Sequence, residues 1–305
     1  MSLLNCNDYV LLTTPEQGGH PSIPIILDSL QVNYDAIPYD YNNYQIDYDK
    51  LNILCDSNKY SYIIFCQSDL LNVPDLNKIN IQNLGIIYDA TQTLGLILGK
   101  CITNPLDYNN TVLIGGAHKT LPAPSCGLIM TNSNEYALKL NRNISPIFLR
   151  NTQPNHMAGM LLALCEQEKF GIEYQRHIIY LANYLANTLE KYGFTVAKID
   201  ANNYTYTHQI FLLMTENDAK SFYQNAVKYN ISLNIKNKRL FNNYGIRLGV
   251  QQIAQYNWSY EEIQQLSKLL FLVKTNSDSN EINKLRKELI NKKIPYFSYD
   301  RITIK

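Results

Sequence analysis

The feature that most constrains the fold is a set of short segments, all in the first half of the chain, that are apolar throughout. They are Tyr9–Leu12, Tyr62–Phe65, Leu84–Tyr88, Val112–Ile114 and Gly127–Met130. Strands buried on both faces show such continuous runs, whereas strands with one solvated face alternate apolar and polar residues. Because helical patterns separate the runs, we expect an open, mostly parallel α/β layer here.

The second half of the chain shows a different pattern. Apolar residues recur at helical spacing from about Ala158 to Leu189, with a break near Gly171, which indicates one long linking helix or two in succession. Short apolar runs and an amphipathic helix follow, as in a small α+β domain. The expected organisation is a large α/β domain over residues 1–150, a linking helix over 151–192, a small domain over 193–274 and a loosely attached tail over 275–305.

Composition and charge exclude several classes of function. Lys and Arg total 27 against 26 for Asp and Glu, so the net charge of +1 provides no global field for nucleic acid or an anionic membrane. No stretch approaches the roughly 18 apolar residues of a membrane span. The first residues lack a basic start followed by an apolar run, so a secretory signal is not expected. These features predict a cytoplasmic protein.

The six cysteines are scattered without a CxxC pair. In a chain of this length that pattern is typical of reduced core thiols, and it predicts neither a disulfide framework nor a metal site.

Two charged residues follow neighbouring predicted strands. Asp89 ends one apolar run, and Lys119 follows the next run 30 residues later. Ligands of open α/β sheets bind at strand ends, and pyridoxal phosphate needs a lysine amine for its aldehyde and an acid for its ring nitrogen. From spacing alone a structural ion pair is the more common arrangement, because buried charges are usually paired.

Longer motifs change that balance. The segments 89–99 and 112–131 closely resemble the cofactor region of serine hydroxymethyltransferase, including the ordered match His-Lys-Thr-Leu before a Pro and a Gly-Leu-Ile strand. The resemblance extends in register from about Asp8 to Val273. Four further segments match motifs of that family: Gln17–Ser22, Ile46–Asp49, Tyr206–Gln209 and Gly245–Gly249.

The resemblance implies a fold-type-I pyridoxal-phosphate architecture, with a mostly parallel large-domain sheet and a smaller α+β domain. It implies that His20 stacks on the cofactor ring, that Asp89 pairs with the ring nitrogen and that Lys119 is the Schiff-base lysine. Arg247 would hold the α-carboxylate of an amino-acid substrate, since a forked guanidinium suits a carboxylate.

The resemblance also implies three lesser contacts. Ser68 matches a serine near the ring hydroxyl of the cofactor, and His118 matches the histidine before the lysine. Gln92 stands where the family has a histidine, three residues after the ring-pairing acid.

Other positions depart from the family. The first predicted strand starts at Tyr9, only 11 residues before His20, so the family's phosphate-binding Ser-Gly-Ser turn and its substrate and folate residues have no counterpart. A Gly-Gly pair that reaches the phosphate of a neighbouring subunit is replaced within Gln153–His156, where Pro154 also lacks an amide donor. Folate use is therefore in doubt.

Three functional hypotheses follow. The first is a homodimeric enzyme acting at the Cα–Cβ bond of a small amino acid, as a folate-free aldolase, a transaldolase or a hydroxymethyltransferase, with a second, smaller polypeptide completing the phosphate site. The second is an inactive subunit or scaffold. The third is a pyridoxal-phosphate aminotransferase. His20, Asp89, Lys119 and Arg247 come from four separate segments, and their joint presence favours the first hypothesis.

Overall fold

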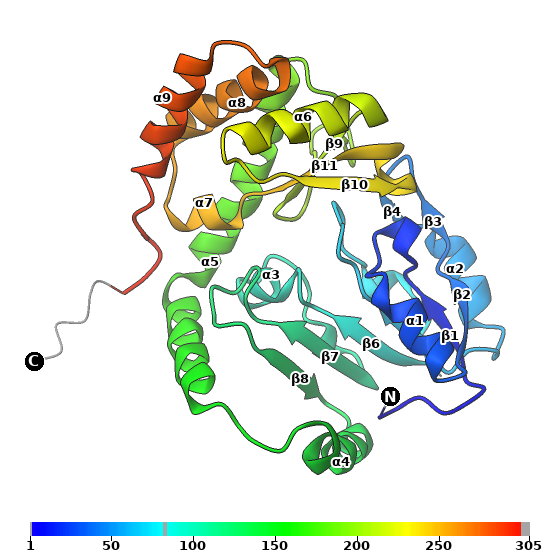
Figure 1. Ribbon diagram of the computed structural model, residues 1–305. Helices are drawn as coiled ribbons and strands as arrows, with labels where there is room; N and C mark the ends of the chain where they lie inside the picture. Colours follow the sequence, from blue (N-terminus) through cyan, green and yellow to red (C-terminus); the bar gives the residue numbers. More distant parts are fainter. Residues whose placement is uncertain (1, 82–83, 300–305) are drawn as a thin grey trace, which may run out of the picture. The chain divides into compact units, whose positions relative to one another are not determined.

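The computed structural model describes residues 2–81 and 84–299 (Figure 1). The chain divides into two compact units, which we treat separately. The first comprises residues 1–40, 45–69 and 73–169, and the second comprises residues 41–44, 70–72 and 170–305. The division falls inside one helix, α5 (Pro154–Lys191). Pro154 is the first residue of α5, where the missing amide costs no helical hydrogen bond.

A six-stranded sheet forms the first unit, in the order β2-β1-β5-β6-β7-β8. All neighbouring strands are parallel except β7 and β8, which are antiparallel. The expected mostly parallel layer is thus confirmed. The strands are β1 (Tyr9–Leu12), β2 (Asn33–Ala36), β5 (Tyr62–Phe65), β6 (Gly85–Asp89), β7 (Thr111–Gly116) and β8 (Gly127–Thr131). Only β2, a polar edge strand, was not expected from an apolar run.

Both faces of the sheet are covered over β1, β5, β6 and β7, which explains their continuous apolar runs. The expected burial on both faces is wrong for the run in β8, where Ile129 and Met130 are exposed. Leu11 and Ile63 belong to the hydrophobic cluster on one face, and Val10 and Ile64 belong to the cluster on the other. Fully burying a side chain of this size contributes about 1.5–3 kcal/mol, so alternating polar residues would weaken either cluster.

Helices and short turns complete the first unit. Asp47 caps α2 by accepting a hydrogen bond from the amide of Lys50, and Ser133 caps α4 by accepting one from Tyr136. The remaining elements are α1 (Ser22–Ser29), α2 (Tyr48–Cys55), α3 (Leu94–Leu98), α4 (Asn134–Asn143), the two-stranded pair β3 (Tyr39–Asp40) and β4 (Gln45–Ile46), a π-helical turn (Ile144–Phe148) and 3₁₀ turns at Pro15–Gln17, Leu76–Lys78 and Pro105–Asp107.

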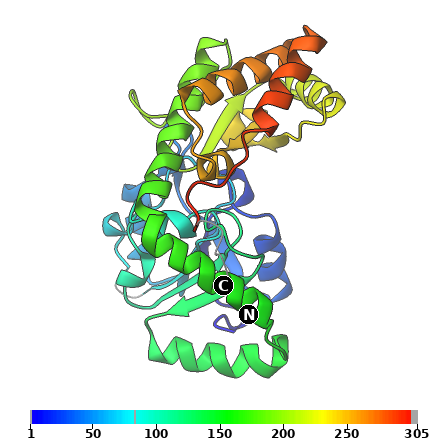
Figure 2. The same ribbon diagram turned by 90° about the vertical axis from the view of Figure 1, so that its left-hand side faces the viewer.

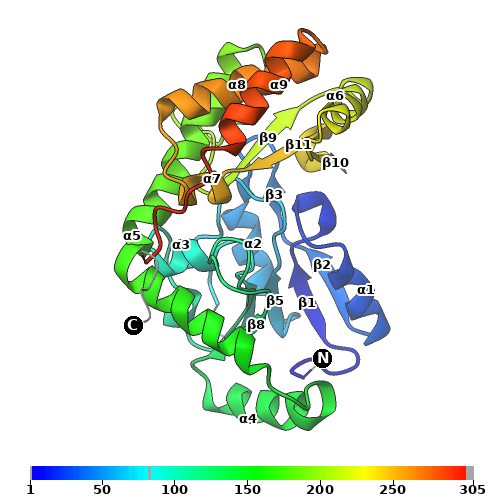
Figure 3. The same cartoon turned by 60° about the vertical axis from the view of Figure 1, so that its left-hand side comes forward.

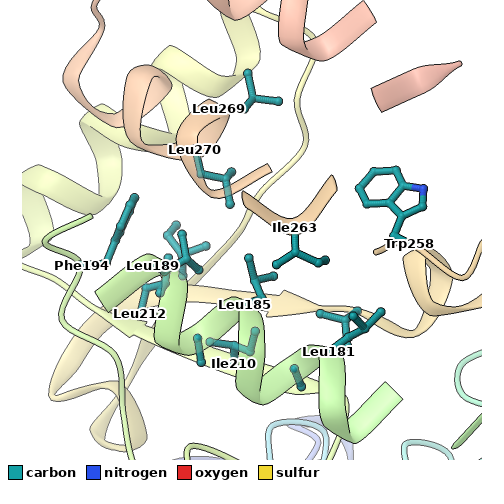
Figure 4. Close-up of a cluster of buried hydrophobic side chains, with 14 of the residues drawn as sticks. Leu181, Leu185, Leu189, Phe194, Ile210, Leu212, Trp258, Ile263, Leu269 and Leu270 are labelled. Atoms are coloured by element: carbon teal, nitrogen blue, oxygen red, sulfur yellow. The ribbon is translucent and has the colours of Figure 1, made fainter. Parts of the chain in front are cut away.

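The second unit packs helices against an antiparallel sheet in the order β10-β11-β9. Leu181, Leu185 and Leu189 of α5 are spaced four residues apart and face the same core as Ile210 of β9 and Ile263 of α8 (Figure 4). The elements are β9 (Gln209–Leu213), α6 (Glu216–Lys228), β10 (Asn234–Lys238), a 3₁₀ turn (Arg239–Phe241), β11 (Asn243–Gly249), α7 (Gln251–Gln255), α8 (Tyr260–Thr275) and α9 (Ser279–Ile290).

The C-terminal tail is not loosely attached. Helix α9 lies beside α8 (Figure 2), and its residues Ile282, Leu285 and Leu289 are buried in the core of the second unit. Phe297 is buried in the same core, and the indole of Trp258 donates a hydrogen bond to the carbonyl of Lys292 (2.9 Å). The expectation of a loose tail is therefore wrong for residues 279–297. The many charges of α9 lie on its outer face and obscured the apolar stripe.

One ion pair of this docked tail should make stability depend on pH. Burial opposes ionisation of Glu262, but hydrogen bonds from Lys292 and Ser259 outweigh burial and lower the pKa of Glu262 to about 2. A carboxyl group whose pKa is lower in the folded than in the unfolded chain adds stability above the unfolded value, and this contribution disappears as pH falls through the folded value. The relevant window therefore lies between about pH 4.5 and pH 2.

We expect Glu262→Gln to lower the free energy of unfolding at pH 7 by about 1.5–3 kcal/mol, the scale of a hydrogen bond to a charged group. The loss relative to the natural chain should shrink as pH falls from 4.5 toward 2. Urea unfolding at several pH values measures both effects. Glu135→Gln is the matched control, because Glu135 pairs with Lys139 on an exposed helix face. A difference between Glu262→Gln and the natural chain that does not change with pH would contradict the assignment.

Candidate active site

The carboxyl ends of four neighbouring parallel strands carry most of the predicted site residues. Their register is fixed by the pairs Leu12↔Ile64 and Phe65↔Tyr88, and by Asp89, which lies opposite Ile114. The four residues that follow or end β1, β5, β6 and β7 are, in that order, His20, Ser68, Asp89 and Lys119. The first unit thus brings these four segments together beyond the carboxyl ends of the strands, where open α/β sheets bind ligands.

The Gly-Gly-His sequence within the Gln17–Ser22 motif (Gly18–His20) forms a tight turn that is hydrogen-bonded to the residues after β5. The carbonyl of Gly18 accepts hydrogen bonds from the amides of Ser68 (2.7 Å) and Asp69 (2.9 Å), and the amide of His20 donates to the carbonyl of Cys66 (3.0 Å). Gly18 has a φ of 92°, which favours glycine. A Cβ atom on Gly19 would lie 2.1 Å from the carbonyl oxygen of Thr13, so the backbone leaves no room for a side chain.

The imidazole of His20 is exposed and held from one side. Its Nδ1 lies 2.7 Å from the hydroxyl oxygen of Ser22 and accepts a weaker hydrogen bond from the Ser22 amide (3.3 Å). These two contacts restrict rotation of the imidazole ring. The arrangement suits a planar ligand stacked on His20.

Asp89 is fixed by a turn that also joins β6 to β7. Its Oδ1 accepts a hydrogen bond from the amide of Thr91 (2.9 Å), and the hydroxyl of Thr91 accepts one from the amide of Gly116 (2.9 Å). Within the described ranges no hydrogen bond uses Oδ2 of Asp89. Sequence reasoning missed the role of Thr91, although a hydroxyl residue two positions after an aspartate is a known signal for such a turn.

Lys119 lies in the connection between β7 and β8, and the residues on either side of it are held in place. Ala117 and Leu121 on either side are fully buried, and the hydroxyl of Thr120 accepts a hydrogen bond from the amide of Gly95 (3.0 Å) at α3. Lys119 itself is half-buried. The backbone around this lysine is therefore positioned by packing on both sides.

His118 and Gln92, for which the family resemblance implies lesser contacts, lie in different environments. His118 is exposed, and its ring lies next to Gly116, since a Cβ built on that glycine would be 3.4 Å from Cε1 of His118. Gln92 is buried in the turn between β6 and α3.

Arg247 belongs to the second unit. It lies on β11 opposite Phe211 of β9 and Asn234 of β10, and it is half-buried. The first glycine of the Gly245–Gly249 motif is required sterically, because a Cβ on Gly245 would lie 2.2 Å from the carbonyl oxygen of Leu212 on the neighbouring strand. The role of Arg247 at the site of the first unit stays a prediction.

The Tyr206–Gln209 motif has a positional role that sequence reasoning missed. Within the second unit it holds residues 70–72, which directly follow Ser68 and Asp69 in the chain. The hydroxyl of Thr207 donates to the carbonyl of Leu70 (2.9 Å), and Oε1 of Gln209 accepts from the amide of Leu70 (3.0 Å). A third buried hydrogen bond runs from the hydroxyl of Thr205 to the carbonyl of Leu71 (3.1 Å). Together the three hydrogen bonds restrict the loop after β5.

Comparison with known proteins identifies the family. The profile described as serine hydroxymethyltransferase matches residues 1–270. The chain belongs to the serine hydroxymethyltransferase family. Serine hydroxymethyltransferase of Picrophilus torridus is 28% identical over 295 residues, covering 88% of this chain and 68% of the relative. That of Metallosphaera sedula is 26% identical, covering 94% of this chain and 69% of the relative.

A solved structure shows the same fold. The crystal structure of L-threonine transaldolase from Pseudomonas fluorescens, in its internal aldimine state, matches with a TM-score of 0.87 and 21% identity, over 98% of this chain and 72% of that one. The predicted resemblance to serine hydroxymethyltransferase and the fold-type-I architecture are thus confirmed.

Two further findings concern other classes of site. Among the described residues no helix is long and apolar enough to cross a membrane, and no three His, Cys, Asp or Glu side chains are grouped to hold a metal ion. The six cysteines are free thiols, but only Cys55 and Cys66 are buried, three are half-buried and Cys6 is exposed, so the expectation of core thiols holds in full only for those two.

Proposed function

We propose that this member of the family is a pyridoxal-phosphate-dependent enzyme, or the cofactor-binding subunit of one, that acts at the Cα–Cβ bond of a small amino acid. The observation that carries the proposal is the gathering of His20, Ser68, Asp89 and Lys119 at the ends of four neighbouring strands. Relatives named serine hydroxymethyltransferase and a fold neighbour named L-threonine transaldolase support the same class of reaction.

The residues present fit this cofactor. Asp89 keeps one carboxylate oxygen, Oδ2, outside the turn that fixes the other, and an ionised carboxylate is what a protonated pyridine requires. His20 presents a planar ring held by Ser22. Lys119 presents an amine from a loop anchored by Ala117 and Leu121. When bound, pyridoxal phosphate supplies an electron sink for a developing carbanion at Cα.

Each residue then has a defined task. Lys119 would hold the cofactor through Nζ, and its amine, once free, would accept or donate a proton at the Cα of the substrate. Asp89 keeps the ring nitrogen protonated, which maintains the electron sink. His20 covers one face of the ring and excludes water from it. Ser68 and His118 add hydrogen bonds at the ring hydroxyl and beside the lysine.

Arg247 would set the reaction type. Two parallel N–H donors of a guanidinium hold a carboxylate in one plane. Fixing the α-carboxylate in this way would hold the bond that breaks perpendicular to the cofactor ring. That bond is Cα–Cβ in a β-hydroxy amino acid and Cα–H in glycine, whose proton must leave before the bond to the aldehyde carbon forms. Glycine with an aldehyde is the simplest substrate pair for such a site.

The proposal does not include folate as a requirement. Gln92 occupies the turn where the family has a histidine. A folate-free aldolase or transaldolase and a one-carbon transferase all use the residue set described above, and assays with and without tetrahydrofolate separate them.

The working assembly we propose is a homodimer with a second, smaller polypeptide. The motifs that match the family place ring and carboxylate contacts on this chain, whereas a Ser-Gly-Ser turn for the cofactor phosphate has no match among them. The separate chain would supply that turn at a helix N-terminus. Purification from the native source followed by native mass measurement is the direct test.

The function is tested with the purified assembly and added pyridoxal phosphate. We expect a visible absorbance band from the bound cofactor. We also expect release of an aldehyde from a β-hydroxy amino acid, which a coupled dehydrogenase assay measures. Asp89→Asn should lower that rate at least about tenfold, because it removes a charged hydrogen bond of roughly 1.5–3 kcal/mol. Asp107→Asn, at an exposed position outside the site, is the matched control. An assembly that stays colourless would instead identify an inactive subunit.

A further inference from the structure

The ladder of hydrogen bonds between the parallel strands β6 and β7 is interrupted at its carboxyl end. Just past β6 the amide of Ala90 donates to the carbonyl of Ile114 (2.7 Å). In a regular parallel ladder the carbonyl of Ala90 would then accept a hydrogen bond from the amide of Gly116. That carbonyl instead accepts from the amides of Thr93 (2.8 Å) and Leu94 (2.7 Å), because the chain turns there into α3. The amide of Gly116 therefore needs another acceptor.

The hydroxyl of Thr91 takes the place of that carbonyl. It accepts the hydrogen bond from the Gly116 amide (2.9 Å), while the amide of Thr91 donates to Oδ1 of Asp89 (2.9 Å). A short side chain with an acceptor atom suits this position. One residue thus binds both the carboxylate at the end of β6 and the backbone at the end of β7.

A second threonine makes the reciprocal hydrogen bond. The hydroxyl of Thr120, a fully buried residue, accepts from the amide of Gly95 in α3 (3.0 Å). Helix α3 follows β6 and lies beside the carboxyl ends of β6 and β7 (Figures 1 and 3). Residues 91–95 and 116–120 are therefore held together by two side-chain hydrogen bonds, one from each segment, which we call the threonine tie.

The threonine tie lies next to the two residues that the proposed chemistry needs most. Asp89 is bonded to the first segment, and Lys119 lies within the second. A carboxylate at the ring nitrogen and an amine at the aldehyde carbon approach opposite ends of one rigid ring, so the separation of their backbones has to be constant. The tie provides a physical means of keeping it constant.

The space beside the Thr91 side chain is small. A Cβ built on Gly116 would lie 3.2 Å from Cγ2 of Thr91 and 3.4 Å from Cε1 of His118. The φ of Gly116 is outside the left-handed region, so these contacts, rather than backbone strain, oppose a side chain there. A larger residue at this position would push against Thr91.

We propose that Thr91 is a positioning residue, whose hydroxyl fixes the carboxylate of Asp89 relative to Lys119. It acts through Asp89 and through the backbone of Gly116. The inference rests on the proposed function, because it concerns the two residues that would hold the ends of the cofactor ring.

The first test uses the chain without cofactor. Thr91→Val keeps the shape of the side chain and removes the hydroxyl, whereas Thr91→Ser keeps the hydroxyl. Hydrogen exchange at the Gly116 amide should be about five- to tenfold faster in Thr91→Val, the factor that corresponds to one lost hydrogen bond. In Thr91→Ser it should stay within about twofold of the natural chain.

The second test uses the purified assembly with pyridoxal phosphate. Thr91→Val should lower kcat about tenfold, because a displaced reacting group costs rate steeply, and should leave the KM for the amino acid unchanged. Thr91→Ser should restore most of the rate. In the Asp89→Asn background Thr91→Val should lower kcat by less than about twofold, since the charged group that Thr91 positions is already absent. Full additivity of the two substitutions would overturn the proposal.

Thr111→Val is the matched control. Thr111 is buried on the same strand, β7, at its opposite end, and its hydroxyl donates to the carbonyl of Asn109 (3.4 Å). This variant also loses a hydroxyl, but it should keep both the exchange rate at Gly116 and kcat.

A compensating pair keeps the test decisive should Thr91→Val fail to fold. Gly116→Ala should lower kcat at least about fivefold, because its Cβ pushes against Cγ2 of Thr91. Combining it with Thr91→Ser, which removes Cγ2, should recover at least about half of the lost rate. Absence of that recovery would overturn the proposal.

Two other results would also contradict the role of the hydroxyl. One is an unchanged kcat in Thr91→Val, and the other is the same loss in Thr91→Ser as in Thr91→Val. Exchange at Gly116 needs no cofactor. A colourless assembly would therefore contradict the proposed function alone, and unchanged exchange in Thr91→Val would contradict the threonine tie alone.

Discussion

Lys119→Ala is expected to reduce turnover of the assembled enzyme by about 10² to 10⁴-fold, the range lost when a positioned proton-transfer group is removed. The variant should also lose the covalent attachment of the cofactor, since no other amine lies in the loop anchored by Ala117 and Leu121. Borohydride treatment followed by peptide mass analysis should find the cofactor mass on Lys119 of the natural chain.

The matched control is Lys191→Ala, at an exposed lysine where α5 ends. It should keep both turnover and the labelled peptide. Labelling spread over several lysines, or a Lys119→Ala variant with unchanged turnover, would remove Lys119 from the proposed chemistry. Thermal unfolding of both variants checks that the fold is retained.

Arg247→Ala is expected to raise the KM for the amino acid about 10 to 100-fold, because a charge-assisted hydrogen bond contributes roughly 1.5–3 kcal/mol. Arg247→Lys should recover little of that loss, since an ammonium group cannot make two parallel contacts with a carboxylate. The measurement is the steady-state KM for glycine in the direction of condensation with an aldehyde.

An amine that lacks the carboxylate provides an internal check on Arg247. Its low rate should be the same for the natural chain and for Arg247→Ala, because the missing contact has no partner in either case. Arg176→Ala, at an exposed position on α5, is the matched protein control. An unchanged KM for glycine in Arg247→Ala would show that the carboxylate is held elsewhere.

The sequence predicted the parallel sheet well because burial on both faces leaves a mark that needs no tertiary information. Four of the five apolar runs correspond to buried, parallel strands of the first unit, and the fifth corresponds to β8, which is antiparallel and exposed. The linking helix was less well defined. Gly171 indicated a break, yet α5 continues through it, since Gly171 is buried and packing outweighs the roughly 1 kcal/mol that glycine costs inside a helix.

The tail shows the limit of reasoning from composition. The charges of residues 281–293 suggested a solvated appendage, but Ile282, Leu285 and Leu289 complete the core of the second unit. Three apolar residues on one helix face are enough for docking when a matching surface exists. The sequence of the tail does not contain that surface, which α8 provides.

The identities of His20, Asp89, Lys119 and Arg247 as candidates followed from the sequence alone, because motif residues keep their order along the chain whatever the fold does with them. What only the tertiary structure decided is how the segments that follow Asp89 and Ser68 are held. Thr91 joins the turn after Asp89 to Gly116, 25 residues away, and Thr207 holds the loop after Ser68 from 137 residues away. Such hydrogen bonds depend on which strand ends lie side by side, and that arrangement is set by packing of the whole unit rather than by any local pattern.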